Sequence, residues 1–119
     1  MNVMLADDRR LYFAGDTAYA PWFADVGERL GPIDLALLPI GAYEPRWFMQ
    51  SIHMNPAEAV RAHLDIGAAL SIGMHFGTFQ LTLEGIDDPL RALDEARRAA
   101  GLDATAFRTL AFGETMELR

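Results

Sequence analysis

The chain has 119 residues, a formal net charge of −7 and no cysteine. This length suits a single domain, and 51% hydrophobic with 23% charged residues is typical of a globular protein. The acidic charge argues against nucleic acid and anionic membranes as general partners. The lack of cysteine excludes disulfides and thiolate metal sites, so a metal site must use His, Asp or Glu. The lack of cysteine also fits a reducing compartment. Because no signal-peptide pattern follows Met1, we expect a cytoplasmic location unless a targeting signal lies upstream.

The first third of the chain predicts a strand pair followed by a helix. Apolar residues 3–5 and 11–14 flank a polar turn, which is typical of two strands joined tightly. A helical pattern begins at Pro21, a residue suited to a first helical turn, and ends at Gly31. The apolar run 35–38 then predicts a strand covered on both faces.

The remaining elements alternate between helix and strand. Residues 41–54 predict a long irregular loop rich in aromatic and charged side chains, and such loops are often functional. Asn55, Pro56 and Glu58 form a helix start, with the helix running to about Gly67. A strand at 70–74, a helix from Asp88 to residue 101 and a final strand pair at 107–112 and 115–118 follow. This order predicts an α/β layered sheet in a single domain, residues 1–119.

Two metal-competent side chains come directly after predicted strands. Asp16 follows the second strand, and His75 ends the strand at 70–74. Each has a structural alternative, because turn aspartates often bond their own backbone and buried histidines are often only hydrogen-bonded. As a pair they are more informative, since ligands gather at the carboxyl ends of strands in α/β sheets.

The other two histidines differ in their surroundings. His53 lies in the irregular loop, where it is either a solvent-facing residue or a substrate contact and proton donor beside a metal. His63 lies on the inner face of the predicted helix, and we expect a packed, hydrogen-bonded core histidine there.

Four motifs occur in order along the chain. They are Phe13-Ala14-Gly15-Asp16-Thr17, Gly41-Ala42-Tyr43-Glu44-Pro45-Arg46-Trp47-Phe48, His53-x-Asn55-Pro56-x-Glu58-Ala59 and His75-Phe76-Gly77-Thr78-Phe79. Together they resemble the metallo-β-lactamase superfamily, in the branch of N-acylphosphatidylethanolamine-hydrolysing phospholipase D and its bacterial relatives. The similarity runs from about Leu11 to the end of the chain.

The resemblance implies a fold and a metal centre. The fold would be the C-terminal half of a four-layer αββα sandwich. In that superfamily two metal ions, usually zinc, lie between the sheets and are held by a His-x-His-x-Asp-His motif and a further His from the first half, then an Asp and a His from the second. Asp16 matches the metal-bridging Asp, His75 the last His ligand, and His53 a histidine near the active site.

One departure from the family pattern changes the expectation for this chain. No His-x-His-x-Asp-His motif is present, and no histidine precedes Asp16. Since a catalytic zinc typically takes three protein ligands, two cannot hold a two-zinc centre. The resemblance implies a hydrolase for the intact protein, a phosphodiesterase of phospholipase D type that acts on a small-molecule or lipid phosphodiester. This chain would then be a fragment or truncated product, or its missing N-terminal half would come from another polypeptide, and we expect it to be inactive alone. The alternative is a non-catalytic α/β domain that self-associates or binds a partner. Missing sheet layers also predict a homo-oligomer.

Overall fold

The computed structural model describes residues 2–118 and contains one five-stranded sheet in that part of the chain. The strands lie in sequence order, and β1 and β2 are antiparallel, whereas β2, β3, β4 and β5 run parallel to one another. The β1–β2 turn places Asp7 and Asp8 at φ of 50° and 64°, as in the two-residue turns that suit a twisted hairpin. The strands are β1 (Asn2–Ala6), β2 (Arg9–Phe13), β3 (Ile33–Pro39), β4 (Ala68–Met74) and β5 (Phe107–Arg108).

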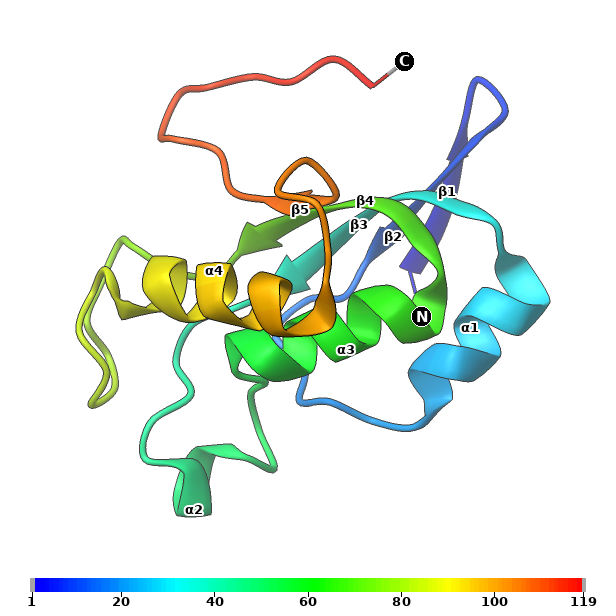
Figure 1. Ribbon diagram of the computed structural model, residues 1–119. Helices are drawn as coiled ribbons and strands as arrows, with labels where there is room; N and C mark the ends of the chain where they lie inside the picture. Colours follow the sequence, from blue (N-terminus) through cyan, green and yellow to red (C-terminus); the bar gives the residue numbers. More distant parts are fainter. Residues whose placement is uncertain (1, 119) are drawn as a thin grey trace.

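Three helices cover one face of this sheet, with α3 between α1 and α4 (Figure 1). The fourth helix, α2, is a single turn that stands away from the sheet on the segment between β3 and α3 (Figure 1). The α/β fold class is therefore confirmed. The helices are α1 (Trp22–Leu30), α2 (Arg46–Met49), α3 (Pro56–Ile66) and α4 (Asp88–Ala100).

The central helix α3 begins and ends as the sequence predicts. The Asn55 side chain accepts a hydrogen bond from the Glu58 backbone N–H, and the Glu58 carboxylate accepts one from the Asn55 N–H. Pro56 occupies the first turn, where a missing N–H has no cost. Gly67 closes the helix in the left-handed conformation that glycine adopts without a steric penalty.

The core lies between the helices and one face of the sheet. Cross-strand partners Tyr12, Ala36 and Ser71 all point toward the helices and are buried. His63 of α3 is 4% exposed and its Nδ1 lies 2.6 Å from the Ser71 hydroxyl, which confirms the predicted core histidine. Burial lowers the pKa of His63, because the charged imidazolium is poorly solvated there.

The opposite face of the sheet carries two apolar rows. Side chains alternate along a strand, so the partners of the core rows point away from the helices. The rows are Leu11–Leu35–Leu70 and Phe13–Leu37–Ile72, each crossing β2, β3 and β4. No helix of residues 2–118 covers this face in Figure 1, and Phe13 is 40% exposed, whereas Leu35 and Ile72 in the same rows are buried.

Two expectations for the loops and the C-terminal end need correction. Residues 41–54 are not wholly irregular, because α2 forms within them. The final strand pair at 107–112 and 115–118 is wrong: only Phe107 and Arg108 pair with β4. A turn follows, in which the Glu114 N–H donates to the Ala111 carbonyl and Gly113 has a φ of 80°, so the chain leaves the sheet instead of returning along it.

Candidate metal site at the carboxyl edge of the sheet

The predicted site residues lie on segments that leave the same edge of the sheet. β2, β3 and β4 are parallel, so their carboxyl ends meet there. Asp16 follows β2 after Gly15, which has a φ of 72°, and its side chain is exposed. His75 directly follows β4 and is also exposed. The segment 41–54, which carries His53, follows β3.

His53 connects the other two residues. Its Nδ1 lies 2.9 Å from the Asp16 carbonyl oxygen, and its ring centroid lies 5.1 Å from that of His75 with the ring planes tilted by 31°. Because a carbonyl oxygen only accepts, Nδ1 carries the hydrogen in this bond. Nε2 is then the ring nitrogen of His53 that this hydrogen bond does not use. The structure therefore gathers Asp16, His53 and His75 at one place.

The backbone at His75 is held in an unusual conformation. Its φ of 64° is left-handed, a region that costs a residue other than glycine on the order of 1–3 kcal/mol. The Ile40 N–H donates to the Met74 carbonyl at 3.0 Å, which fixes the neighbouring segments together. A Cβ on Gly41 would lie 2.2 Å from the His75 carbonyl oxygen, so only glycine permits this approach.

A half-buried carboxylate, that of Glu84, joins the two loops that flank the site. Glu84 accepts hydrogen bonds from the Ala42 N–H at 2.8 Å, the Glu44 N–H at 2.9 Å and the Thr82 hydroxyl at 2.6 Å. Burial by itself raises the pKa of Glu84, but these hydrogen bonds outweigh it and hold the pKa below the ordinary value of 4.5. The ionised Glu84 thus fastens residues 82–84 to the start of the 41–54 segment.

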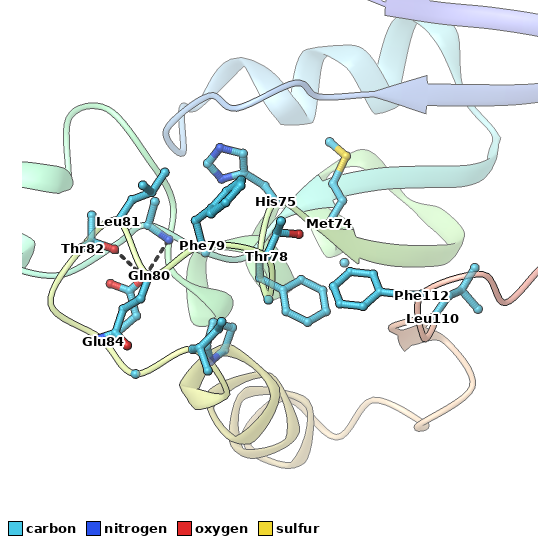
Figure 2. A pocket seen from close by; sticks show the side chains of 18 residues that line it. Met74, His75, Thr78, Phe79, Gln80, Leu81, Thr82, Glu84, Leu110 and Phe112 are labelled. Atoms are coloured by element: carbon cyan, nitrogen blue, oxygen red, sulfur yellow. Dashed lines mark hydrogen bonds between the residues drawn. The ribbon is translucent and has the colours of Figure 1, made fainter.

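A cavity of about 460 Å³ begins beside His75. It lies between the end of β4, the loop 77–86, the start of α4 and the segment near Leu110. Figure 2 shows Phe79 close to His75 on one side, Phe112 on another and Glu84 at the far end of the loop. Its lining is mainly apolar, with few polar groups placed among the rings, as in many small-molecule sites.

The donors present do not complete a metal centre. In the part of the chain that the structure describes, no three His, Asp or Glu side chains are grouped closely enough to hold a metal ion. Asp16 and His75 are suitable donors for zinc, but a catalytic zinc usually takes three protein ligands. The side chains of residues 2–118 therefore fit a part of such a centre only, and no reaction step through a metal follows from them.

Comparison with known proteins identifies the family. Residues 2–76 match the family model described as the beta-lactamase superfamily domain. The chain belongs to the metallo-β-lactamase superfamily. N-acyl-phosphatidylethanolamine-hydrolyzing phospholipase D 1 of Caenorhabditis elegans is 47% identical over 119 residues, covering 96% of this chain and 33% of the relative. A metal-dependent hydrolase of Listeria monocytogenes is 33% identical, covering 98% of this chain and 43% of that one.

A solved structure agrees with the fold. Igni18, a metallo hydrolase from Ignicoccus hospitalis, superposes with a TM-score of 0.65 at 24% identity, covering 96% of this chain and 43% of its own. The predicted superfamily and its N-acylphosphatidylethanolamine phospholipase D branch are thus confirmed. The chain spans about a third of the length of the C. elegans relative. The activity of an intact protein that contains this chain therefore belongs to the proposal below.

Two supporting residues were not predicted from the sequence. Glu84 lies in an exposed, apolar-rich loop, and no local pattern indicates its bonds to residues 42 and 44. Gly41 could have been found, because a glycine directly after a buried strand often marks a close backbone approach.

Proposed function

We propose that this chain contributes Asp16 and His75 to the metal centre of a hydrolase, a phosphodiesterase of phospholipase D type, whose other ligands lie outside residues 2–118. The observation that supports this most is the contact of His53 with both residues, through the Asp16 carbonyl and the His75 ring. We propose zinc, two ions in the intact protein, because His and Asp donors suit it.

His53 is the residue of this chain that we assign to proton handling. Its Nδ1 hydrogen is engaged by the Asp16 carbonyl, so Nε2 is the atom that can exchange a proton with a substrate or leaving group. The His75 ring lies beside the His53 ring, with the ring centroids 5.1 Å apart. His53 is accordingly a catalytic residue in this proposal, and not a third metal ligand.

The cavity next to His75 supports a substrate with an apolar part. Phe79, Leu81 and Phe112 line it, and each is more than 70% exposed, so the cavity is open to a ligand from outside. A lipid phosphodiester combines an apolar chain with a group that reacts at the strand ends. Cyclic diesters and lactones need not carry such a chain and are the competing substrates.

A chimera tests the function. The matched third of the C. elegans relative is replaced by this chain, and hydrolysis of an N-acylphosphatidylethanolamine, bis(p-nitrophenyl) phosphate and a lactone is measured. We expect diester hydrolysis that Asp16→Asn and His75→Asn each abolish, with the fold retained. Activity that survives both substitutions would contradict the ligand assignment. Hydrolysis of the lactone alone would contradict the substrate class.

The 119-residue chain by itself should bind zinc weakly and not hydrolyse bis(p-nitrophenyl) phosphate. The reason is its ligand set, which supplies two of the three or more protein donors that a catalytic zinc needs. Stoichiometric, tight zinc together with turnover in the purified chain would contradict this expectation.

The apolar rows on the sheet face that no helix covers, which are partly exposed, favour a second role, self-association of this chain. Each 100 Å² of apolar surface left in water forgoes about 2.5 kcal/mol, and soluble monomers seldom carry large open patches. We propose that a second copy covers the rows around Leu37 when the chain is alone. Light scattering at micromolar concentration tests this, and a monomer would contradict it.

No helix in the described part of the chain has the length and apolar character to cross a bilayer. The cytoplasmic location expected from the sequence stays a prediction.

A further inference from the structure

The guanidinium group of Arg46 lies at the centre of the 41–54 segment. Arg46 is the first residue of α2, and its side chain points back toward the start of α3. Its Nη1 donates to the Tyr43 carbonyl at 3.0 Å and to the His53 carbonyl at 3.4 Å. Its Nη2 donates to the Glu58 carboxylate, and both side chains are about three-quarters buried.

These bonds connect one cation to both ends of the segment and to the helix behind it. Tyr43 stands near the beginning of the segment, His53 near its end, and Glu58 belongs to the capping box of α3. The same Glu58 oxygen also accepts the Asn55 N–H, two residues beyond His53. Arg46 therefore links the backbone of His53 to the capped start of α3, a helix of the core.

This arrangement suits the needs of His53. Its ring lies between the Asp16 carbonyl and the His75 ring, yet His53 is carried by the long 41–54 segment, in which the α2 side chains Trp47 and Phe48 are exposed. A planar guanidinium can serve several acceptors in fixed directions, whereas a lysine ammonium cannot reproduce that fork. Loss of one clamp would let the loop end move by the roughly 1 Å that a catalytic geometry does not tolerate.

We propose that Arg46 is a positioning residue that holds His53 between Asp16 and His75. It acts by tying the Tyr43 and His53 carbonyls to the Glu58 carboxylate at the start of α3. The inference rests on the proposed function for the role of His53, while the geometry that it predicts is measurable without any activity.

The experiment is NMR on the full 119-residue chain at about pH 8, where histidine rings are neutral. In the native chain, ring nitrogen spectra should show hydrogen on Nδ1 of His53, and cross-peaks should connect the rings of His53 and His75. Arg46→Gln should remove the cross-peaks and return His53 to a mixture of tautomers. Arg46→Lys should do the same while keeping more of the thermal stability, because the ion pair with Glu58 can persist.

Two controls separate positioning from unfolding. The cross-peaks between His63 and Phe107, whose ring centroids lie 5.6 Å apart in the core, should stay unchanged in both variants. Arg91→Gln removes an exposed ion pair with Asp88 on α4 and should leave His53 untouched. An Arg46→Gln chain with an intact core and unaltered His53 signals would overturn the proposal. If instead the chimera described above fails while these signals change as expected, the function is wrong and the positioning role stands.

Discussion

Glu84→Gln tests whether one carboxylate fastens the loops around the site. The native carboxylate accepts from two backbone N–H groups and the Thr82 hydroxyl. Glutamine keeps one acceptor oxygen and turns an NH₂ donor toward the other partners, so at least one partly buried N–H of Ala42 or Glu44 loses its acceptor. Since hydrogen bonds to charged groups contribute about 1.5–3 kcal/mol each, we expect a loss of about 2 kcal/mol in the free energy of unfolding at neutral pH.

The pH dependence gives the sharper result. The pKa of Glu84 is lower in the folded chain than its ordinary 4.5, so its contribution is fully present above 4.5 and is lost as the pH falls through the folded value. Urea unfolding from about pH 7 to about pH 3 should therefore show the gap between native and Glu84→Gln chains narrowing below 4.5. Hydrogen exchange at Ala42 and Glu44 should also accelerate in the variant. Glu28→Gln, on the exposed side of α1, is the matched control. A gap that is absent at neutral pH, or constant across the series, would refute the reasoning.

Three further substitutions test the close backbone contact at Gly41, the sheet face without helices at Leu37 and the buried histidine His63. Gly41→Ala places a Cβ against the His75 carbonyl, and we expect a loss of about 1–3 kcal/mol by urea unfolding; an unchanged midpoint would contradict the close approach. Leu37→Glu puts a charge on the open sheet face and should shift light scattering toward monomer, whereas Leu64→Glu on the exposed side of α3 should not; equal behaviour would exclude that face as the interface. Burial lowers the pKa of His63 below its ordinary 6.5, so the unfolded chain binds more protons and stability should fall as the pH drops from 6.5 through the folded value. The same pH series on the His63→Gln variant should lack that loss of stability. An equal loss in the native chain and the variant would contradict the assignment of the effect to His63.

The elements with strong local signals were predictable. The cap at Asn55 and Pro56 and the glycine stop at Gly67 specify α3 through local hydrogen bonds and backbone freedom, which depend little on the rest of the fold. The apolar run at 35–38 predicted β3, although the structure covers only one of its faces with helices.

The C-terminal end was not predictable in the same way. Residues 107–118 have the apolar content of a strand pair, but pairing depends on a neighbouring strand, and β5 is only two residues long at the edge of the sheet. Strand propensity is strongly dependent on such context. The same limit applies to the loops, where α2 and the clamp of Arg46 depend on Glu58 and on carbonyls distant in space.

The position of the candidate site residues at one sheet edge was predicted, but the contacts between them were not. Asp16 and His75 were expected at the same edge because parallel strands end together, and the structure brings both into contact with His53. The bond from His53 to the Asp16 carbonyl spans 37 residues, and no local pattern in the sequence indicates it.

A Co²⁺ titration of the purified chain followed by NMR tests most directly whether Asp16 and His75 belong to one metal centre. Imidazole and carboxylate donors bind this ion, and its unpaired electrons broaden nearby signals. We expect weak Co²⁺ binding, with signal broadening centred on Asp16, His53 and His75 and absent at the buried His63. Asp16→Asn and His75→Asn should each abolish this broadening. Broadening centred elsewhere, or unchanged in the two variants, would contradict the assignment of these residues to a metal site.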